Sequence, residues 1–461
     1  MPGAVRTGAV NVDGFPRTPG KPMLTGLIAW AALLAMVAVV WASRHLEINR
    51  ALREHKPLAS DSYDGPPGEA PRVSVIIAAK DEEENIETCV RSMLAQDYAN
   101  FELIVVNDRS RDRTPQLLER LAEADDRLRV VTVSRLREGW FGKNNAMREG
   151  LALASGQWLC FGDADCRQTS TRTLSVAMRK ALEERIDFLS VLPVLETASV
   201  WERIIQPVCG AIMMFWFHPK RVNDPRSSAA YANGAFMLMT RAAYERIGGH
   251  ENVRTQVNED MHMARAAKQA GLRLFVVQNR DLYRTRMYSS LPAIWRGWSR
   301  IFYGCFGTYR KLIVSLLVLL LVSVLPWVSM VAAWSVLAIR PSHAGWAWWA
   351  VAWAATLAVL LNQTVIWRYY RMTQTDPRLA PTYIVGALFG TGMLLNAMLK
   401  VGGRTTTTWR GTTYRGLQLE GPPPVAGWPA DRLVRPKSEW LWNTPRRRSE
   451  GYAPAVGPKE Q

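Results

Sequence analysis

The chain has 461 residues, of which 48% are hydrophobic and 21% are charged, and this balance excludes a mainly disordered protein. Its mean hydropathy of −0.08 is too polar for a chain that lies wholly in lipid. A net charge of +17 suits anionic lipid headgroups, phosphorylated substrates or nucleic acid, and long apolar runs at both ends of the chain favour the first two. We therefore expect a membrane-associated protein with no nucleic-acid partner.

The N-terminal part of the chain predicts a tail, an anchor and a linker. Residues 1–22 are rich in Gly, Pro and Arg and predict a disordered tail. Residues 23–42 contain no charged side chain, and a helix of this length, about 30 Å, matches the hydrocarbon core of a bilayer. Because this run exceeds the apolar part of a signal peptide and lacks a small-residue cleavage site, we expect an uncleaved anchor. Residues 43–71, rich in proline after position 56, predict a linker.

Residues 72–310 are more polar and alternate short apolar segments with charged helical ones. Strands are expected at residues 73–79, 101–106, 129–133 and 158–162, and helices at residues 84–96 and 114–124. This alternation predicts an α/β domain with a mainly parallel sheet that is covered by helices on both faces. The five cysteines all lie in the middle segment without a Cys-x-x-Cys pair, which predicts neither disulfides nor a zinc site and is typical of a reduced, cytosolic compartment.

Three more apolar stretches follow, and each is long enough to span a bilayer: residues 312–339, 346–367 and 382–399. With the anchor they predict one transmembrane helix before the α/β domain and about three after it, within residues 311–400. Residues 401–461 predict a basic, Pro-rich tail.

The membrane topology contains a conflict. With the α/β domain in the cytosol, four simple spans would place the Arg-rich tail outside, against the preference of basic residues for the cytosolic side. A hairpin over residues 312–339, kinked at Pro326, would resolve the conflict, as would a fourth segment that lies in the interface. The sequence leaves the side of the tail open.

Carboxylates follow two of the predicted strands at the point where each strand ends. Asp81 comes shortly after the first strand, and Asp108 shortly after the second. Ligands of open α/β sheets bind at the carboxyl ends of the strands, so these residues outline a site that could hold a base or a ribose. The alternative is that both carboxylates only cap the helices that follow.

The sharpest motif is Asp163-Ala164-Asp165, at the end of a buried strand. Two carboxylates one residue apart can bind a hard cation, Mg²⁺ or Mn²⁺, together with the phosphates of a substrate. The alternative is a turn that is capped by aspartate. Upstream, Lys143 and Asn144 follow a Gly-containing bend, where they could orient a sugar or phosphate, or cap a helix.

A further acidic pair, Glu259-Asp260, opens a helical run. A carboxylate at a helix N-terminus tends to stay ionised, as a general base must be at neutral pH, although helix capping is again the alternative. Asn233 and Gly234 precede another apolar strand.

Taken in order, these motifs resemble those of the large inverting glycosyltransferase family two, which has a GT-A fold: Ala-Ala-Lys-Asp-Glu, Asn-Asp-Arg-Ser, Asp-Ala-Asp, Asn-Gly-Ala and Glu-Asp, over residues 72–300. The resemblance implies a nucleotide-sugar-binding domain with a mixed, mainly parallel sheet. It also implies that Asp81 and Asp108 contact the nucleotide, that Asp165, with Asp163, binds the metal on the diphosphate, and that Asp260 is the catalytic base.

The candidate site residues thus fall into four groups by role. They are Asp260 as the base; Asp81, Asp108, Lys143 and Asp163 at the nucleotide; Asp165 at the metal; and Asn233, Gly234, Glu259, Trp298 and Arg300 at the acceptor or nearby.

One motif of the family is missing. Processive members carry Gln-x-x-Arg-Trp after the base, whereas this chain has Ile294-Trp-Arg-Gly-Trp298-Ser-Arg300. The arrangement resembles instead the membrane-bound branch that glycosylates lipids, with hopanoid- and carotenoid-associated transferases and ceramide glucosyltransferases. Trp298 and Arg300 also fit a membrane-interface belt. Residues 204–217, strongly apolar, predict either an interfacial helix that guides a lipid or an ordinary core segment.

We therefore expect a multi-pass enzyme of the cell membrane with a cytosolic catalytic domain. It would transfer one sugar from a nucleotide-sugar, a UDP-sugar being favoured, to a lipid hydroxyl with the help of Mg²⁺ or Mn²⁺. A polysaccharide synthase or a polyprenyl-phosphate sugar transferase is the alternative within the enzyme class. A non-catalytic membrane protein with a degenerate domain is the alternative outside it.

Overall fold

The computed structural model describes residues 21–54, 56–339, 341 and 345–403, and the backbone of three short strands beyond them. These strands, β11 (Thr406–Trp409), β12 (Thr412–Arg415) and β13 (Gln418–Leu419), pair in antiparallel fashion. The tail expected at residues 1–22 lies outside the described residues except for its last two, and so does most of the basic tail. All described residues fall within one compact unit, residues 1–420.

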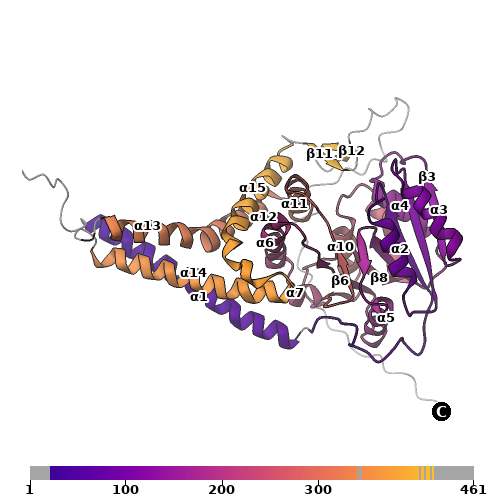
Figure 1. Cartoon of the computed structure of the whole chain (residues 1–461), viewed down its shortest axis with the longest axis horizontal. Helices are drawn as coiled ribbons and strands as arrows, with labels where there is room; N and C mark the ends of the chain where they lie inside the picture. Colours follow the sequence, from indigo (N-terminus) through magenta and orange to yellow (C-terminus); the bar gives the residue numbers. More distant parts are fainter. Residues whose placement is uncertain are drawn as a thin grey trace, which may run out of the picture. The chain divides into compact units, whose positions relative to one another are not determined.

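A seven-stranded sheet forms the centre of the α/β domain (Figure 1). Its strands, in spatial order, are β3 (Leu128–Val133), β2 (Phe101–Asp108), β1 (Val73–Ala79), β4 (Trp158–Asp163), β8 (Phe236–Thr240), β6 (Phe188–Leu192) and β9 (Leu274–Gln278). Only β8 runs antiparallel to its neighbours in this sheet. The expected mixed and mainly parallel sheet is confirmed.

The strands are almost continuously apolar because both faces of the sheet are covered by helices. Along β1, Val75 and Ile77 pack into one layer and Ile76 into the other. The first layer holds α2 (Ile86–Leu94), α3 (Thr114–Ala124) and α5 (Thr173–Glu183), and the second holds α4 (Gly142–Leu151), α8 (Arg241–Arg246) and α10 (Glu259–Gln269). A Cβ on Gly150 of α4 would lie 2.8 Å from Ile76 Cγ2, so this glycine lets the helix lie directly on the sheet.

Smaller elements complete the α/β domain. A three-stranded sheet of β5 (Cys166–Gln168), β10 (Tyr283–Thr285) and β7 (Val194–Leu195) follows the end of β4, and two short helices are α7 (Pro219–Asn223) and α9 (Gly249–Asn252). The segment expected as a linker is tied to the large sheet, because Leu58 N–H donates to Gln278 O and Leu58 O accepts from Arg280 N–H, each at 2.8 Å. The chain between the anchor and β1 is therefore fixed against the end of β9.

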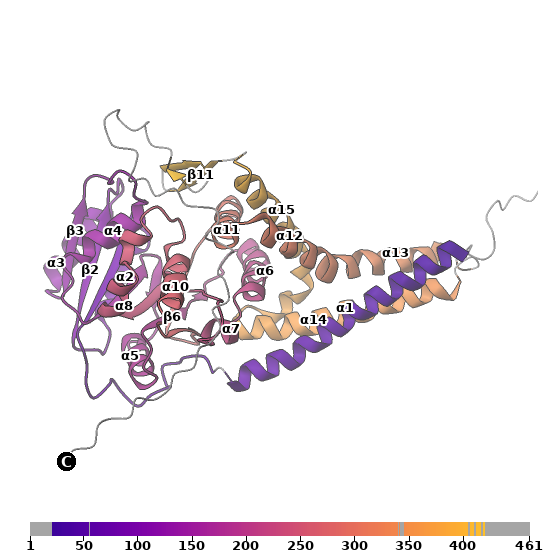
Figure 2. The ribbon, with the colours of Figure 1, turned by 180° about the vertical axis from the view of Figure 1, so that it is seen from behind.

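Four helices of the described chain are long and apolar enough to cross a membrane. They are α1 (Lys21–Glu54), the run Tyr309–Ile339, α14 (Trp346–Met372) and the run Pro377–Val401, which consists of a 3₁₀ turn (Pro377–Thr382) and α15 (Tyr383–Val401). This confirms one such helix before the α/β domain and three after it. Figure 2 shows α1, α13 (Leu325–Ile339) and α14 side by side, with small side chains such as Ala333 and Ala355 buried between them.

The hairpin considered at Pro326 is wrong, because the chain continues in one direction. Tyr309–Ile339 is a single run made of α12 (Tyr309–Val318), a π-helical turn (Leu319–Val324) and α13. Proline has no N–H to donate to the carbonyl of Val322, and the indole N–H of Trp41 in α1 donates to that carbonyl at 3.0 Å. The wide π-helical turn lies directly before the proline, where extra room is needed.

Two helices connect the sheet to the apolar helices: α6 (Val200–Trp216) and α11 (Leu291–Phe306), and both pack against α15 (Figure 1). A Cβ on Gly386 of α15 would lie 2.4 Å from the carbonyl oxygen of Ile204, so α6 and α15 cross at very close distance. One face of α6 is core, while Trp201 and Phe215 are exposed.

Candidate active site

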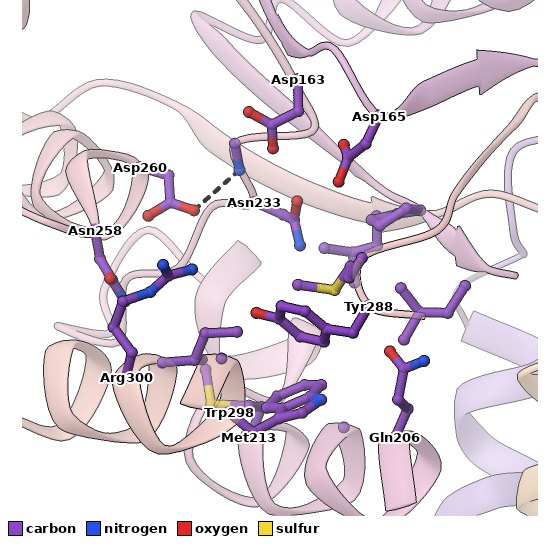
Figure 3. Close-up of a pocket in the computed structure, with 18 of the residues that line it drawn as sticks. Asp163, Asp165, Gln206, Met213, Asn233, Asn258, Asp260, Tyr288, Trp298 and Arg300 are labelled. Atoms are coloured by element: carbon purple, nitrogen blue, oxygen red, sulfur yellow. Dashed lines mark hydrogen bonds between the residues drawn. The ribbon is translucent and has the colours of Figure 1, made fainter. Parts of the chain in front are cut away.

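A cavity of about 740 Å³ opens at the carboxyl ends of β1, β2 and β4 (Figure 3). Because β8 is antiparallel to β4, its amino end lies at the same edge of the sheet. Asn233 and Gly234, just before β8, therefore line the cavity together with residues that follow β1, β2 and β4. This is the edge at which open α/β sheets bind ligands.

Asp163 and Asp165 lie side by side at the end of β4. Partial burial, followed by the charges of Asp163 and Glu82, raises the pKa of Asp165 to about 7. A divalent cation would relieve this repulsion, so the pair fits Mg²⁺ or Mn²⁺. No group of three His, Cys, Asp or Glu side chains in the described chain is arranged to hold an ion, so the remaining ligands would come from a substrate.

Lys143, in the first turn of α4, joins two of the acidic residues. Its Nζ lies 2.6 Å from Asp163 Oδ1 and 2.7 Å from Glu259 Oε1. Although burial opposes the charged form, the carboxylates of Asp163 and Glu259 hold the pKa of Lys143 well above its usual value. The site thus contains a permanent ammonium group, which is suited to phosphate.

Asp260 lies in the first turn of α10 and faces the same cavity (Figure 3). Its Oδ2 accepts a hydrogen bond from Gly234 N–H at 2.9 Å, and its Oδ1 accepts one from Met261 N–H at 2.7 Å. Burial, followed by the charge of Glu259, raises the pKa of Asp260 to about 7. A carboxylate with this pKa is well matched to proton transfer near neutral pH.

Gly234 could not carry a side chain without disturbing this cluster. A Cβ there would lie 2.9 Å from Lys143 Nζ and 3.4 Å from Glu259 Oε1. The glycine lets the chain before β8 approach Lys143, Glu259 and Asp260 closely.

The strand ends of β1 and β2 differ from one another. Asp108 is buried in the cavity wall, and both of its oxygens accept hydrogen bonds from Arg109, at 2.7 and 2.9 Å. Asp81 does not line the cavity; its Oδ1 accepts from Arg111 N–H at 2.8 Å, and Glu82 lines the cavity in its place. Asp81 and Arg109 both have positive φ, at 53° and 57°, a conformation that costs energy outside glycine and often marks functional sites.

The structure therefore gathers in one cavity all the predicted site residues except Asp81. Glu82 and Arg109 were missed, because the acidic run after β1 and the charged run after β2 do not reveal which side chains point inward.

The opposite wall of the cavity comes from α6, α11 and the end of α14. It is largely apolar, with Met213, Met214, Phe217, Ile301 and Met372. Trp298 and Arg300 of α11 and Gln206 of α6 line the cavity on this side, and Tyr288 lies between Gln206 and the carboxylates (Figure 3). Gln206 was missed, and its signal was a lone amide within the apolar segment 204–217.

Two family models match the chain. Residues 74–248 match the model described as "Glycosyl transferase family 2", and residues 191–362 match "Glycosyl transferase family group 2". The chain carries a glycosyltransferase family 2 domain. The GT-A fold expected for such a domain, preceded by one apolar helix and followed by three, is confirmed.

Relatives of this glycosyltransferase domain include proteins from two bacteria. Beta-monoglucosyldiacylglycerol synthase of Trichormus variabilis is 27% identical over 245 residues, 51% of this chain and 51% of that protein. 4,4'-Diaponeurosporenoate glycosyltransferase of Staphylococcus aureus is 25% identical over 262 residues, 55% of this chain and 66% of that protein. The chain thus spans about half the length of the synthase.

Among solved structures, a mannosyltransferase of Pyrobaculum calidifontis in complex with GDP-Man and Mn²⁺ is similar to this glycosyltransferase at 18% identity and a TM-score of 0.45. The match covers 80% of this chain and 98% of that one.

Proposed function

We propose that this chain is a membrane-bound, inverting glycosyltransferase that moves a single sugar from a UDP-sugar to a hydroxyl group of a lipid. The observation that carries the proposal is one cavity with two different walls. Carboxylates and the Lys143 ammonium form one wall, which suits a nucleotide-sugar and its metal. Apolar side chains of α6 and α11 form the other, which suits an amphipathic acceptor. The names of the two bacterial relatives, which refer to a glucosyldiacylglycerol and a diaponeurosporenoate, support a lipid acceptor.

In the proposed reaction Asp260 is the general base. Its carboxylate takes the proton of the acceptor hydroxyl while the hydroxyl oxygen bonds to the anomeric carbon of the sugar. The bond from that carbon to the diphosphate oxygen breaks in the same step, so the configuration inverts and a nucleoside diphosphate leaves. The N–H groups of Gly234 and Met261 hold both oxygens of Asp260 in a fixed orientation.

The leaving diphosphate gains negative charge as the bond breaks. Lys143 is placed to neutralise part of this charge, since its ammonium lies between Asp163 and Glu259. Mg²⁺ or Mn²⁺ held by Asp165 and Asp163 would supply further positive charge to the diphosphate. Asp108, fixed by Arg109, is the proposed contact to the nucleoside, and Glu82 takes the place in the cavity that was expected for Asp81.

We place the catalytic domain in the cytosol of a multi-pass protein of the cell membrane. All five cysteines are free and buried, which agrees with a reducing compartment. Nucleotide-sugar and metal would then enter the cavity from the cytosol, and the lipid would enter from the membrane.

The test uses the detergent-purified full chain with Mn²⁺ and a panel of UDP- and GDP-sugars, with and without total membrane lipid. We expect release of nucleoside diphosphate from a UDP-sugar, and we expect lipid to stimulate it. If lipid does not change the release of nucleoside diphosphate, the proposed lipid acceptor is refuted. If no nucleotide-sugar yields nucleoside diphosphate, the proposed glycosyltransferase activity is refuted. Identical reactions without protein and with EDTA provide the controls.

A further inference from the structure

Gln206 is a buried amide without a protein partner. Its side chain is 1% exposed, lies in the middle of α6, and points into the cavity (Figure 3). Neither Oε1 nor Nε2 has a hydrogen-bond partner among the described residues. Burying an amide without a partner is costly, so this residue is expected to bind something that the cavity receives.

The position of Gln206 is held by its own helix and by α14. Gln206, Gly210, Met213 and Phe217 recur at helical spacing, and all four line the cavity. The hydroxyl of Tyr369 in α14 donates to the carbonyl of Pro207 at 3.1 Å, next to Gln206. The stripe is thus polar at one end and apolar at the other.

A second unpartnered donor lies in the same part of the cavity. Trp298 of α11 is 5% exposed, and its Nε1 has no partner within the described chain. The ring of Tyr288 lies between the side chains of Trp298 and Gln206 on one side and the carboxylates of the cavity on the other (Figure 3). That ring is fixed, because a Cβ on Gly297 would lie 2.1 Å from its Cζ atom. The amide and the indole therefore offer two donor nitrogens, with three N–H bonds in all, and one oxygen acceptor beside an aromatic ring.

Asp260 and the metal-site carboxylates lie on the other side of Tyr288 (Figure 3). The hydroxyl that reacts must reach Asp260, so Gln206 is left to contact a different group of the acceptor. An acceptor whose only polar group were the reacting hydroxyl would leave the amide buried and unpaired.

We propose that Gln206 anchors the headgroup of the acceptor by binding a second polar group, separate from the hydroxyl that is glycosylated. The acceptor class is then a lipid with at least two hydrogen-bonding groups in its head, and simple long-chain alcohols are poor acceptors. This inference rests on the proposed lipid glycosylation. Gln206 acts here as a specificity-determining residue, with Trp298 as its neighbour.

The test compares the wild-type chain with Gln206→Met, which keeps the length and the unbranched shape but removes the amide. With total membrane lipid as the acceptor, we expect the half-saturating lipid concentration to rise about tenfold, because two neutral hydrogen bonds are lost. The KM for the nucleotide-sugar should not change. Ile205→Val, a neighbouring core position outside the cavity lining, is the matched control and should leave both values unchanged.

Two competitors with the same hydrocarbon chain test the headgroup directly. In the wild type, 1-monooleoylglycerol should inhibit transfer to membrane lipid at lower concentration than oleyl alcohol, and the difference should shrink in Gln206→Met. The proposal would be overturned if the two competitors inhibit the wild type equally, or if neither inhibits it.

Other outcomes separate this inference from the proposed function. One such outcome is that lipid stimulates nucleoside diphosphate release by the wild type, but the half-saturating lipid concentration is the same in Gln206→Met. This would overturn the role of Gln206 and leave the proposed lipid glycosylation in place. A wild type without lipid stimulation would overturn both. If Gln206→Met fails to fold, Gln206→Glu takes its place, since it has the same shape but no N–H donors. A raised KM for the nucleotide-sugar in that variant would indicate a structural role and overturn the proposal.

Discussion

Asp165 and Asp260 share an unusual property, a pKa near 7, and burial is the main cause for both. A neighbouring carboxylate adds to the effect, Asp163 for the first and Glu259 for the second. Lys143 contacts both of these neighbours. One ammonium group therefore links the pair Asp163 and Asp165 with the pair Glu259 and Asp260, and the charge on either pair influences the other.

The first prediction concerns Asp260 as the base. Asp260→Asn keeps the shape of the side chain but removes the proton acceptor, and its amide can accept only one of the two backbone N–H bonds. The rate should therefore fall roughly 100-fold or more while nucleotide binding persists. The measurement is kcat beside the Kd for UDP. Substantial residual turnover would remove Asp260 from the role of base.

The same residue predicts a pH profile. A base works only when ionised, and its pKa is raised to about 7. At saturating Mn²⁺, kcat/KM should therefore stay level above pH 7 and fall about tenfold per unit below it. A profile that stays flat down to pH 5 would show that another group takes the proton.

A second prediction concerns the metal pair. Asp165→Ala should weaken the binding of UDP in the presence of Mn²⁺ by roughly 10- to 100-fold or more, because a direct metal ligand is lost. Calorimetry with and without Mn²⁺ measures the effect. Asp125→Ala is the control, since Asp125 pairs with Arg127 away from the cavity lining. If Asp165→Ala and the wild type bind UDP equally well in the presence of Mn²⁺, the Asp-x-Asp motif is a turn capped by aspartate and not a metal site.

At the scale of elements, the crossing of α6 and α15 carries a third prediction. A Cβ on Gly386 would lie 2.4 Å from a backbone oxygen, whereas the contacts of one on Gly390, one turn further, begin at 3.4 Å. Gly386→Ala should therefore destabilise the protein by about 1–3 kcal/mol. Gly390→Ala should be neutral or slightly stabilising, since alanine favours the helix. Thermal unfolding in detergent compares the two, and equal midpoints would refute the close crossing.

The elements that sequence patterns predicted best are those with a strong local signal. Val73–Ala79 and Thr114–Ala124 match their predicted ends, because an uninterrupted apolar run and a regular amphipathic pattern have clear limits. The strand predicted at residues 101–106 continues to Asp108, since backbone pairing with β3 persists after the apolar run ends. Phe188–Leu192 and Leu274–Gln278 were not predicted as strands, because five residues with four apolar side chains do not distinguish a strand from part of a buried helix.

For the whole molecule, most of the candidate site was predicted by one rule, namely that ligands of open α/β sheets bind at the carboxyl ends of the strands. It brought Asp108, Asp163 and Asp165 to one edge before any contact was known. The rule could not decide between Asp81 and Glu82, because that choice depends on a positive φ at one residue. It also could not find Gln206, whose role comes from the packing of α6 against a distant part of the chain.

The end of α14, with Tyr369 and Met372, and Thr375 just after it form part of the cavity wall, and the hydroxyl of Tyr369 also donates to a carbonyl of α6. A fragment that stopped at residue 310 would therefore lose a piece of its own substrate pocket along with its attachment to lipid. The apolar helices are not an interchangeable anchor. A fusion of residues 72–310 to another membrane protein would therefore also have to include α14.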